Sequence, residues 1–267
     1  MNAVVFDVAL TAYIVAAAAA LGSLLGRRDE LGRFASRMAA GGLACHTVAL
    51  GMRWVELGRV PVVTLAELVS VMLWVVVAAE LLLERRSGLG ALGTFVLPVV
   101  LALGLALPTG LRTLALEPRA TGWTIVHVAF VLIGLSALVL NFGGALMYIL
   151  QERQLKSRRP GTIFYMLPPL EVLDRLTYGT LAAGFPFLTA GLVLGVVSGS
   201  RPAGARALLD PLSAISIAMW VVYALTLAGR VVGYWRGRRA AYFAIAGFGA
   251  LLLTLGIGAL YQGRHGS

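Results

Sequence analysis

The sequence predicts an all-α, polytopic integral membrane protein with eight transmembrane helices and both termini outside. Of its 267 residues, 59% are hydrophobic and only 13% are charged, and the mean hydropathy is +0.88. Apolar runs of about 20 residues recur along the chain, which is the length that crosses the hydrocarbon core of a bilayer. No soluble domain, long linker or low-complexity tract separates these runs, so residues 1–267 are predicted to form a single transmembrane domain.

The composition also excludes several classes of protein. A net charge of +10 would suggest a nucleic-acid partner in a soluble protein, but here the basic residues lie between apolar runs, as membrane topology requires. Cys45 is the only cysteine, so an intrachain disulfide and a Cys-x-x-Cys redox or zinc motif are excluded. No Gly-x-Ser-x-Gly, His-Glu-x-x-His, Walker or Rossmann pattern occurs, so the sequence predicts no enzymatic activity.

Each predicted transmembrane helix corresponds to one apolar run. The first run has no basic segment before it and no small-residue cleavage site, so we interpret it as a retained helix and not as a signal peptide. The fifth run is almost thirty residues long, with His127 near its start and basic residues after its end. The predicted spans are residues 3–25, 37–56, 62–83, 89–108, 123–150, 179–199, 212–234 and 240–261.

The basic residues indicate how these helices are oriented. Most of the 22 lysines and arginines lie in the connections that follow the first, third, fifth and seventh spans. The positive-inside rule assigns these connections to the cytoplasm and therefore assigns both termini to the outside. The residues that carry this assignment are Arg27, Arg28, Arg33, Arg37, Arg85, Arg86, Arg153, Lys156, Arg158, Arg159, Arg175, Arg230, Arg236, Arg238 and Arg239.

Two connections contain signals for the start of a helix. In the segment LPPLEVLDRL, residues 167–176, three leucines share one helical face, which predicts a short amphipathic helix on the inner membrane surface. On the outer side, Asp210 followed by Pro211 predicts the start of the seventh span. An aspartate caps the free amides of a helix, and proline is accommodated at the first helical position.

Several residues inside the spans have more than one interpretation. Asn141 is expected to form hydrogen bonds across helices. Glu67 is either interfacial or a hydrogen-bond partner of a metal-ligating histidine, and Glu80 is expected to snorkel or to pair beside Arg85. Trp220 packs either in the helical core or on a porphyrin. The glycines expected at close helix contacts are Gly143, Gly144, Gly191 and Gly195.

The three histidines all fall in the outer half of the predicted bundle. His127 lies about four residues inside the fifth span, His265 follows the eighth span, and His46 lies roughly 12 Å deep in the second span. Ionisable groups inside a membrane are costly and usually face a functional interior. Because two neutral imidazoles form an axial pair for haem iron, His127 and His265 are a candidate pair; the alternative is three unrelated residues.

A series of loosely defined motifs follows in order from about residue 40 onward. The loop RWVELGRVPVVTLAEL precedes WTIVHV, which begins the fifth span. The connector segments LQERQLK and LPPLEVLDRL come next, and DPLSAISIAMWVVYALTLAGR and GIGALYQGRHG complete the series. The residues that define these motifs are Gly58, Pro61, Thr64, Leu65, Glu67, Trp123, His127, Asp210, Pro211, Trp220, Tyr223, Arg230 and His265.

These motifs resemble those of the cytochrome c assembly family of haem-handling membrane proteins, which includes the CcsA and HemX-like branch. The resemblance implies that His127 and His265 match the family's two outer haem-ligand histidines. It also implies that His46 matches an intramembrane histidine and lines the inner part of the haem pocket or a path toward it. It also implies that Asp210 and Trp220 belong to the cofactor-binding region. The expected cofactor is haem b, with its iron held by His127 and His265.

Two departures from the family pattern point to the HemX-like branch. The family's haem-attachment proteins carry several tryptophans just before Asp-Pro, whereas SGSRPAGARALL, residues 198–209, contains none. The histidine that those proteins have in the seventh span is replaced here by Ala228. This sequence is similar to the HemX-like members of the family, which have eight spans and lack the tryptophan-rich segment.

The resemblance implies a haem-binding protein that acts in cytochrome c biogenesis as a haem carrier, transporter or assembly factor. Haem is expected near the outer face, without bond-making chemistry by the protein. The expected partners are haem, the lipid bilayer, and other cytochrome c biogenesis membrane proteins or a haem-synthesis enzyme, with no nucleic acid. The expected location is the bacterial cell (inner) membrane, as a multi-pass protein.

Two alternatives from other classes remain open. One is a haem-free regulatory or scaffold membrane protein that modulates haem biosynthesis through its basic loops. The other is a small-molecule transporter, which typically requires internal repeats, and no repeat is detected between the two halves of this sequence.

Overall fold

The structure is a computed structural model that describes residues 2–26, 28–105, 122–157, 161–197, 210–233 and 235–265. Within these ranges the regular secondary structure is helical, which confirms the all-α prediction for this part of the chain. Among the described residues, eight long helices correspond in order to the eight predicted spans, and one short helix, α6 (Thr162–Met166), lies in a connection. The long helices are α1 (Asn2–Gly26), α2 (Asp29–Leu57), α3 (Leu65–Ser87), α4 (Leu92–Leu105), α5 (Gly122–Lys156), α7 (Leu170–Val197), α9 (Pro211–Val231) and α10 (Arg238–His265).

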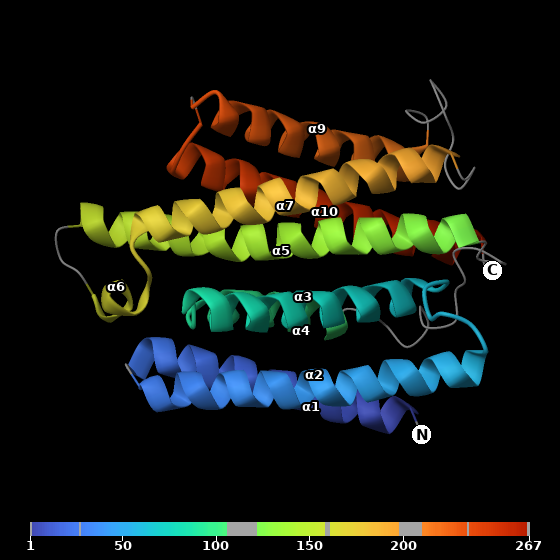
Figure 1. Ribbon diagram of the computed structural model, residues 1–267, viewed down its shortest axis with the longest axis horizontal. Coiled ribbons are helices and arrows are strands. Elements are labelled where there is room, and N and C mark those ends of the chain that lie inside the picture. The colour runs from blue at the N-terminus through green and yellow to red at the C-terminus, as the bar shows by residue number, and fades with distance from the viewer. Residues whose placement is uncertain are drawn as a thin grey trace.

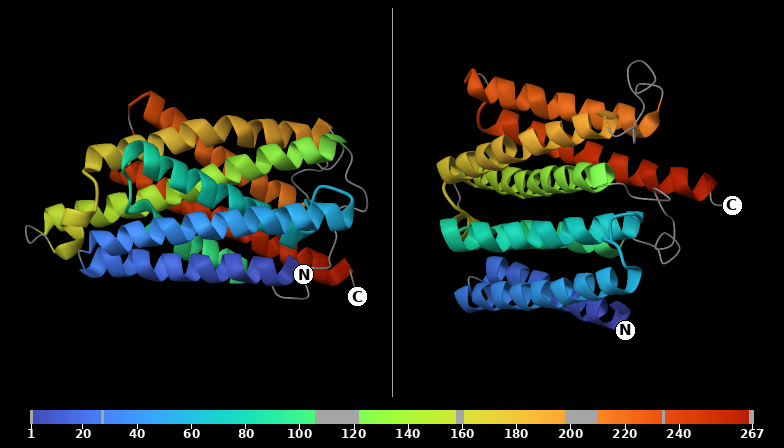
Figure 2. Two further views of the ribbon diagram at one scale, coloured as in Figure 1. Left: turned by 60° about the horizontal axis from the view of Figure 1, so that its bottom comes forward. Right: turned by 45° about the vertical axis from the view of Figure 1, so that its right-hand side comes forward.

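The long helices lie side by side in a bundle (Figure 1). The α1 and α2 pair forms one edge, α3 and α4 lie next to it, and α5 and α7 separate them from the α9 and α10 pair at the other edge. The N-terminal end of α1 and the C-terminal end of α10 lie at the same end of the bundle in every view (Figures 1 and 2). The chain therefore begins and ends on one side of the bundle.

Five of the described helices are long and apolar enough to cross a membrane, so the protein is a multi-pass membrane protein. They are α1, α3, α5, α7 and α9. In α2 the uncharged stretch is confined to the middle, because acidic and basic residues occupy both its ends, and the described part of α4 has only 14 residues. Crossing by all eight helices, with both termini outside, stays a prediction.

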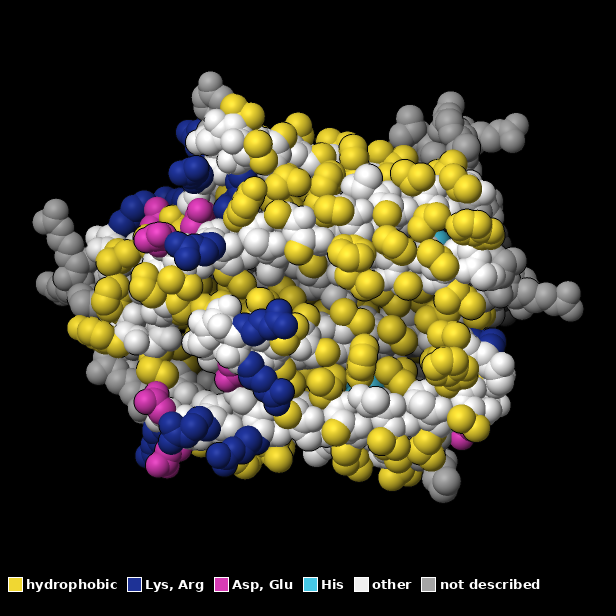
Figure 3. Space-filling model, viewed as in Figure 1, with side chains coloured by type: hydrophobic (Ala, Val, Ile, Leu, Met, Phe, Trp, Pro, Cys, Tyr) yellow, Lys and Arg dark blue, Asp and Glu magenta, His cyan; other side chains and the backbone are white. Residues whose placement is uncertain are grey.

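The charged side chains are distributed unevenly between the two ends of the bundle. Figure 3 shows Lys, Arg, Asp and Glu side chains gathered at the end where α2, α7 and α10 begin, and a broad apolar surface over the rest of the visible face. We refer to this as the charged end. An apolar belt with basic residues concentrated at one end is the distribution that the positive-inside rule describes.

Glycines allow α5 and α7 to pack with their backbones in close contact. A Cβ atom on Gly134 would lie 2.9 Å from the backbone nitrogen of Leu188, and one on Gly184 would lie 2.5 Å from the Cβ of Ala137. Asn141 donates from Nδ2 to the carbonyl oxygen of Thr177 at 2.6 Å, which confirms the predicted hydrogen bond across helices. Small residues and interhelical hydrogen bonds hold membrane helices together in this way.

The segment LPPLEVLDRL is not the separate surface helix that its leucine pattern predicts. Only residues from Leu170 onward are helical, and they continue without interruption to Val197 as α7, so the helix that carries the predicted span 179–199 begins before residue 179. The continuous helix forms because Pro169 is compatible with a helix start, and Leu173 and Leu176 are buried against the rest of the protein. The leucine face is therefore part of the core.

Candidate functional site

Three of the five predicted site residues, His127, Asp210 and His265, lie at the end of the bundle opposite the charged end. At this end α5 and α9 begin and α7 and α10 finish, as the colour order in Figure 1 shows. His127 lies in the first turns of α5, Asp210 precedes α9, and His265 is the last residue of α10. The fold thus brings three segments that are far apart in the sequence to one end of the bundle.

His127 is held by a backbone group of the neighbouring helix. Its Nδ1 lies 2.6 Å from the carbonyl oxygen of Gly191 in α7, and its side chain is half-buried. Since a carbonyl oxygen only accepts hydrogen bonds, Nδ1 carries the proton, and Nε2 keeps the lone pair in the neutral ring. A histidine that ligates a metal commonly has its other ring nitrogen fixed in this manner, which orients the ring.

Gly191 is suited to this contact because it lacks a side chain. A Cβ atom at this position would lie 2.7 Å from Cγ2 of Val131 and 3.1 Å from the backbone nitrogen of Val131, both on α5. The absence of a Cβ lets the two helices approach closely enough for the Gly191 carbonyl to reach the imidazole one turn away from Val131. The sequence prediction of close packing at Gly191 is confirmed, but its link to His127 was not predicted.

Asp210 and Trp220 have local structural partners in α9 and α7. The carboxylate of Asp210 accepts a hydrogen bond from the backbone nitrogen of Ser213 at 2.9 Å, as the predicted N-cap of α9 requires. Trp220 donates from Nε1 to Oγ1 of Thr189 at 2.9 Å and stacks on Phe185, with 5.6 Å between ring centroids. The contacts of Trp220 attach α9 to α7, whereas the Asp210 contact lies within the start of α9.

Two sequence predictions about this end concern residues that the structure does not describe. The side chain of His265 lies outside the described part, although the backbone of α10 extends to this residue. The tryptophan-free segment at residues 198–209 also lies outside the described residues.

His46 is fully buried in a different part of the bundle. Its Nδ1 lies 3.3 Å from the hydroxyl oxygen of Tyr13 in α1, and its Nε2 lies 2.9 Å from Oγ of Ser70 in α3. Phe6 packs edge-on against the imidazole. Both ring nitrogens therefore have partners, and His46 links α2 to α1 and α3.

The loop between α2 and α3 is organised by the motif residues that the sequence singled out. Gly58 ends α2 with φ at 61°, in the left-handed region that favours glycine. Thr64 and Glu67 form a reciprocal capping box at the start of α3. Glu67 also pairs with Arg53 at 3.3 Å and Arg59 at 3.1 Å, which accounts for this buried carboxylate without a histidine partner.

The charged end contains a buried ion pair that the sequence interpretation missed. Nη2 of Arg230, at the end of α9, lies 2.9 Å from Oδ1 of Asp174 in α7 and 2.8 Å from Oγ1 of Thr177. The backbone nitrogen of Gly237 donates to the same Asp174 oxygen at 3.1 Å. An arginine within an apolar span is a sequence signal for a buried partner, but nothing in the sequence identifies which acidic residue that partner is.

Glu80 differs from the sequence prediction, which expected it to snorkel or to pair. Its side chain is buried, with only 2% of the residue exposed, and within the described ranges its Oε2 has no hydrogen-bond partner. It points into the bundle and not toward the water because it lies on the buried face of α3, with Val76, Val77 and Leu81.

Comparison with known proteins identifies the family that the sequence motifs resemble. Residues 62–265 match the family model described as cytochrome C assembly protein. The chain is 30% identical over 247 residues to a cytochrome c biogenesis protein CcsA from Guillardia theta, covering 84% of this chain and 82% of that protein. It is 29% identical over 263 residues to one from Thermosynechococcus vestitus (83% and 82%), and 27% identical over 260 residues to one from Chlorella vulgaris (84% and 82%).

Proposed function

Because the chain belongs to the cytochrome c assembly protein family, we propose that it acts in cytochrome c biogenesis as a haem carrier, transporter or assembly factor. Haem b is bound near the outer face of the bacterial cell membrane, at the end of the bundle opposite the charged end. His127 and His265 are the axial ligands of its iron. The proposed role needs no nucleophile and base, so the protein is not an enzyme.

The observation that carries this proposal is the bond between His127 and Gly191. The 2.6 Å contact from Nδ1 to the carbonyl oxygen fixes the ring and gives Nε2 the lone pair that iron requires. The end of α10 supports the same site, since its backbone brings His265 to the end of the bundle where α5 begins (Figure 1). Bis-histidine ligation is a common way to hold haem b.

The remaining predicted site residues take supporting positions in this proposal. Asp210 sets the start of α9, and Trp220 joins α9 to α7, the helix whose carbonyl holds His127. His46 has partners on both ring nitrogens, which hold it between α1 and α3, and it lines the inner part of the haem pocket or a path toward it. The absence of tryptophan from residues 198–209 and the presence of Ala228 support the HemX-like branch, in which haem is handled but not attached.

The visible spectrum of the detergent-purified protein, oxidised and reduced with dithionite, tests the proposal. We expect a sharp Soret band and, on reduction, the resolved α and β bands of six-coordinate haem. The variants His127→Ala and His265→Ala should lose or broaden these bands, whereas Glu171→Gln, a control at an exposed position of the charged end, should keep them.

The opposite outcome is equally clear. A protein that neither contains haem after purification nor gains these bands when hemin is added would overturn the proposal. That result would favour the haem-free regulatory or scaffold function, in which basic residues at the charged end meet a haem-synthesis enzyme. Normal spectra in both His127→Ala and His265→Ala would place haem at another site.

A further inference from the structure

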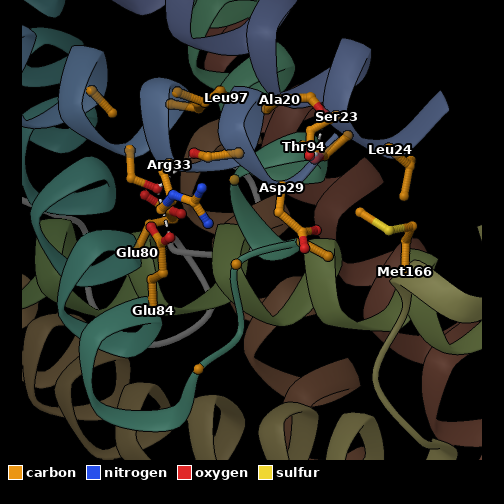
Figure 4. A pocket seen from close by; sticks show the side chains of 18 of the residues that line it. Ala20, Ser23, Leu24, Asp29, Arg33, Glu80, Glu84, Thr94, Leu97 and Met166 are labelled. Carbon is orange, nitrogen blue, oxygen red and sulfur yellow. Dashed lines mark hydrogen bonds between the residues drawn. The ribbon is translucent and has the colours of Figure 1, made fainter. Parts of the chain in front are cut away.

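A second candidate site lies at the charged end, whereas His127 lies at the other end of the bundle, where α5 begins. It is a cavity of about 380 Å³ between the end of α1, the start of α2, the end of α3 and the start of α4, with α6 beside it. This volume falls in the range of small-molecule sites, which is about 300–1,000 Å³. Figure 4 shows this cavity, with Arg33, Glu80 and Glu84 directed toward one another.

Two carboxylates of α3 line the cavity one helical turn apart. Glu80 lies at its buried inner part, and within the described ranges its Oε2 has no hydrogen-bond partner. Glu84 is half-exposed and accepts a hydrogen bond from the hydroxyl of Ser36 at 2.5 Å. Like charges four residues apart on a helix repel each other, and a buried acceptor without a donor is costly. A positively charged hydrogen-bond donor placed between them removes both costs.

The protein's own cations do not provide this donor in the described part of the structure. Arg33 lines the cavity at its exposed rim, but no ion pair joins it to Glu80 or Glu84. Asp29 adds a third acidic side chain to the rim. Carboxylates thus outnumber the guanidinium groups among the residues that surround this cavity.

The shape and chemistry of the cavity favour an organic cation over a metal ion. Among the described residues, no group of three or more histidine, cysteine, aspartate or glutamate side chains is placed to hold a metal. A primary ammonium group has three N–H donors and matches the carboxylate pair and the nearby Ser36 hydroxyl. Arg33 at the rim matches an anionic group attached a few atoms away from that ammonium.

We propose that this cavity binds a phosphoethanolamine group, with the ammonium at Glu80 and Glu84 and the phosphate at Arg33. Such a group belongs either to the headgroup of a membrane lipid or to a free small molecule. The cavity opens among the charged residues that mark the membrane interface, where lipid headgroups are found. This site goes beyond the proposed haem function and does not depend on it.

Calorimetric titration of the detergent-purified, full-length protein tests the proposal. The probes are dihexanoyl phosphatidylethanolamine and dihexanoyl phosphatidylcholine, which share a phosphate but differ because the choline nitrogen has no N–H donor. We expect the ethanolamine lipid to bind roughly tenfold more tightly. Titration with free phosphoethanolamine separates the two sources, since binding of that probe alone indicates a free ligand and binding of the lipid alone indicates a headgroup.

Substitutions of the two cavity carboxylates test whether the lipid binds in this cavity. Glu80→Gln should reduce the preference for ethanolamine to less than about threefold, and Glu84→Gln should weaken it in the same direction. Glu171→Gln, a matched control at an exposed position on the same end, should keep the full preference. Equal binding of the two lipids by the unmodified protein, or an unchanged preference in Glu80→Gln, overturns the proposal. If Glu80→Gln does not fold, the comparison of lipids on the unmodified protein still decides it.

Discussion

Replacing Gly191 by alanine should damage both the packing of α5 on α7 and the position of His127. The added Cβ would lie 3.1 Å from the backbone nitrogen of Val131 and 2.7 Å from its Cγ2. Ordinary contact begins at 3.4 Å, so the backbones must separate by 0.3 Å at the nitrogen, or by up to 0.7 Å if the methyl group does not move. Overpacking of this kind costs about 1–3 kcal/mol.

The same displacement acts on the bond between His127 and the Gly191 carbonyl, which is 2.6 Å long. Separation on this scale stretches it to about 3 Å or slightly more, near the upper limit for a good hydrogen bond. The imidazole then loses part of the constraint that orients it. If His127 ligates haem iron, the Soret band of the variant should broaden without a loss of protein.

Gly179→Ala is the matched control for this experiment. Gly179 lies on the same helix, and a Cβ there would have no atom within 4 Å. Both variants gain about 1 kcal/mol of helix propensity, so the difference between them isolates the steric cost. The midpoints of unfolding by sodium dodecyl sulfate in mixed micelles, followed by tryptophan fluorescence, measure that difference. Equal midpoints for the two variants would refute the reasoning.

Two further predictions concern the polar contacts. Asp174→Asn should destabilise the protein by about 2 kcal/mol, because it leaves the buried guanidinium of Arg230 without its counter-charge, whereas Glu171→Gln should cost less than about 0.5 kcal/mol. The same unfolding assay compares them, and equal midpoints would contradict this account. Glu67→Ala should cost about 1 kcal/mol more than Glu67→Gln, since glutamine keeps the helix cap while both variants lose the ion pairs. Indistinguishable thermal unfolding of these two variants would argue against the cap.

Features governed by local sequence were predictable. The cap at Asp210, the glycine contact at Gly191 and the crossing hydrogen bond of Asn141 each follow from one residue type in a known kind of segment. The cap depends on neighbours within one helical turn. The other two contacts form with whichever helix packs closely, so they can be predicted without identifying the partner helix.

The contacts that depend on how distant helices are arranged were not predictable. Asp174 and Arg230 are 56 residues apart, and Gly191 lies 64 residues from His127, so no spacing rule links either pair. The burial of the Glu80 side chain was also predicted wrongly. Its proximity to Arg85 in the sequence does not indicate which face of α3 is buried in the bundle. The position of α7 was misjudged because a leucine face suits a surface helix and a core helix equally well.

The length of α5 makes the protein sensitive to the thickness of its membrane. With 35 residues, this helix is about 50 Å long, whereas the hydrocarbon core of a bilayer is about 30 Å thick. The excess is absorbed by tilting of the helix or by its extension into the water on the charged side. Because glycine contacts attach α7 to α5 along its length, both helices should tilt as one rigid unit and carry His127 and Gly191 with them. A thinner or thicker bilayer would therefore change the depth of the histidine while its bond to α7 stays intact.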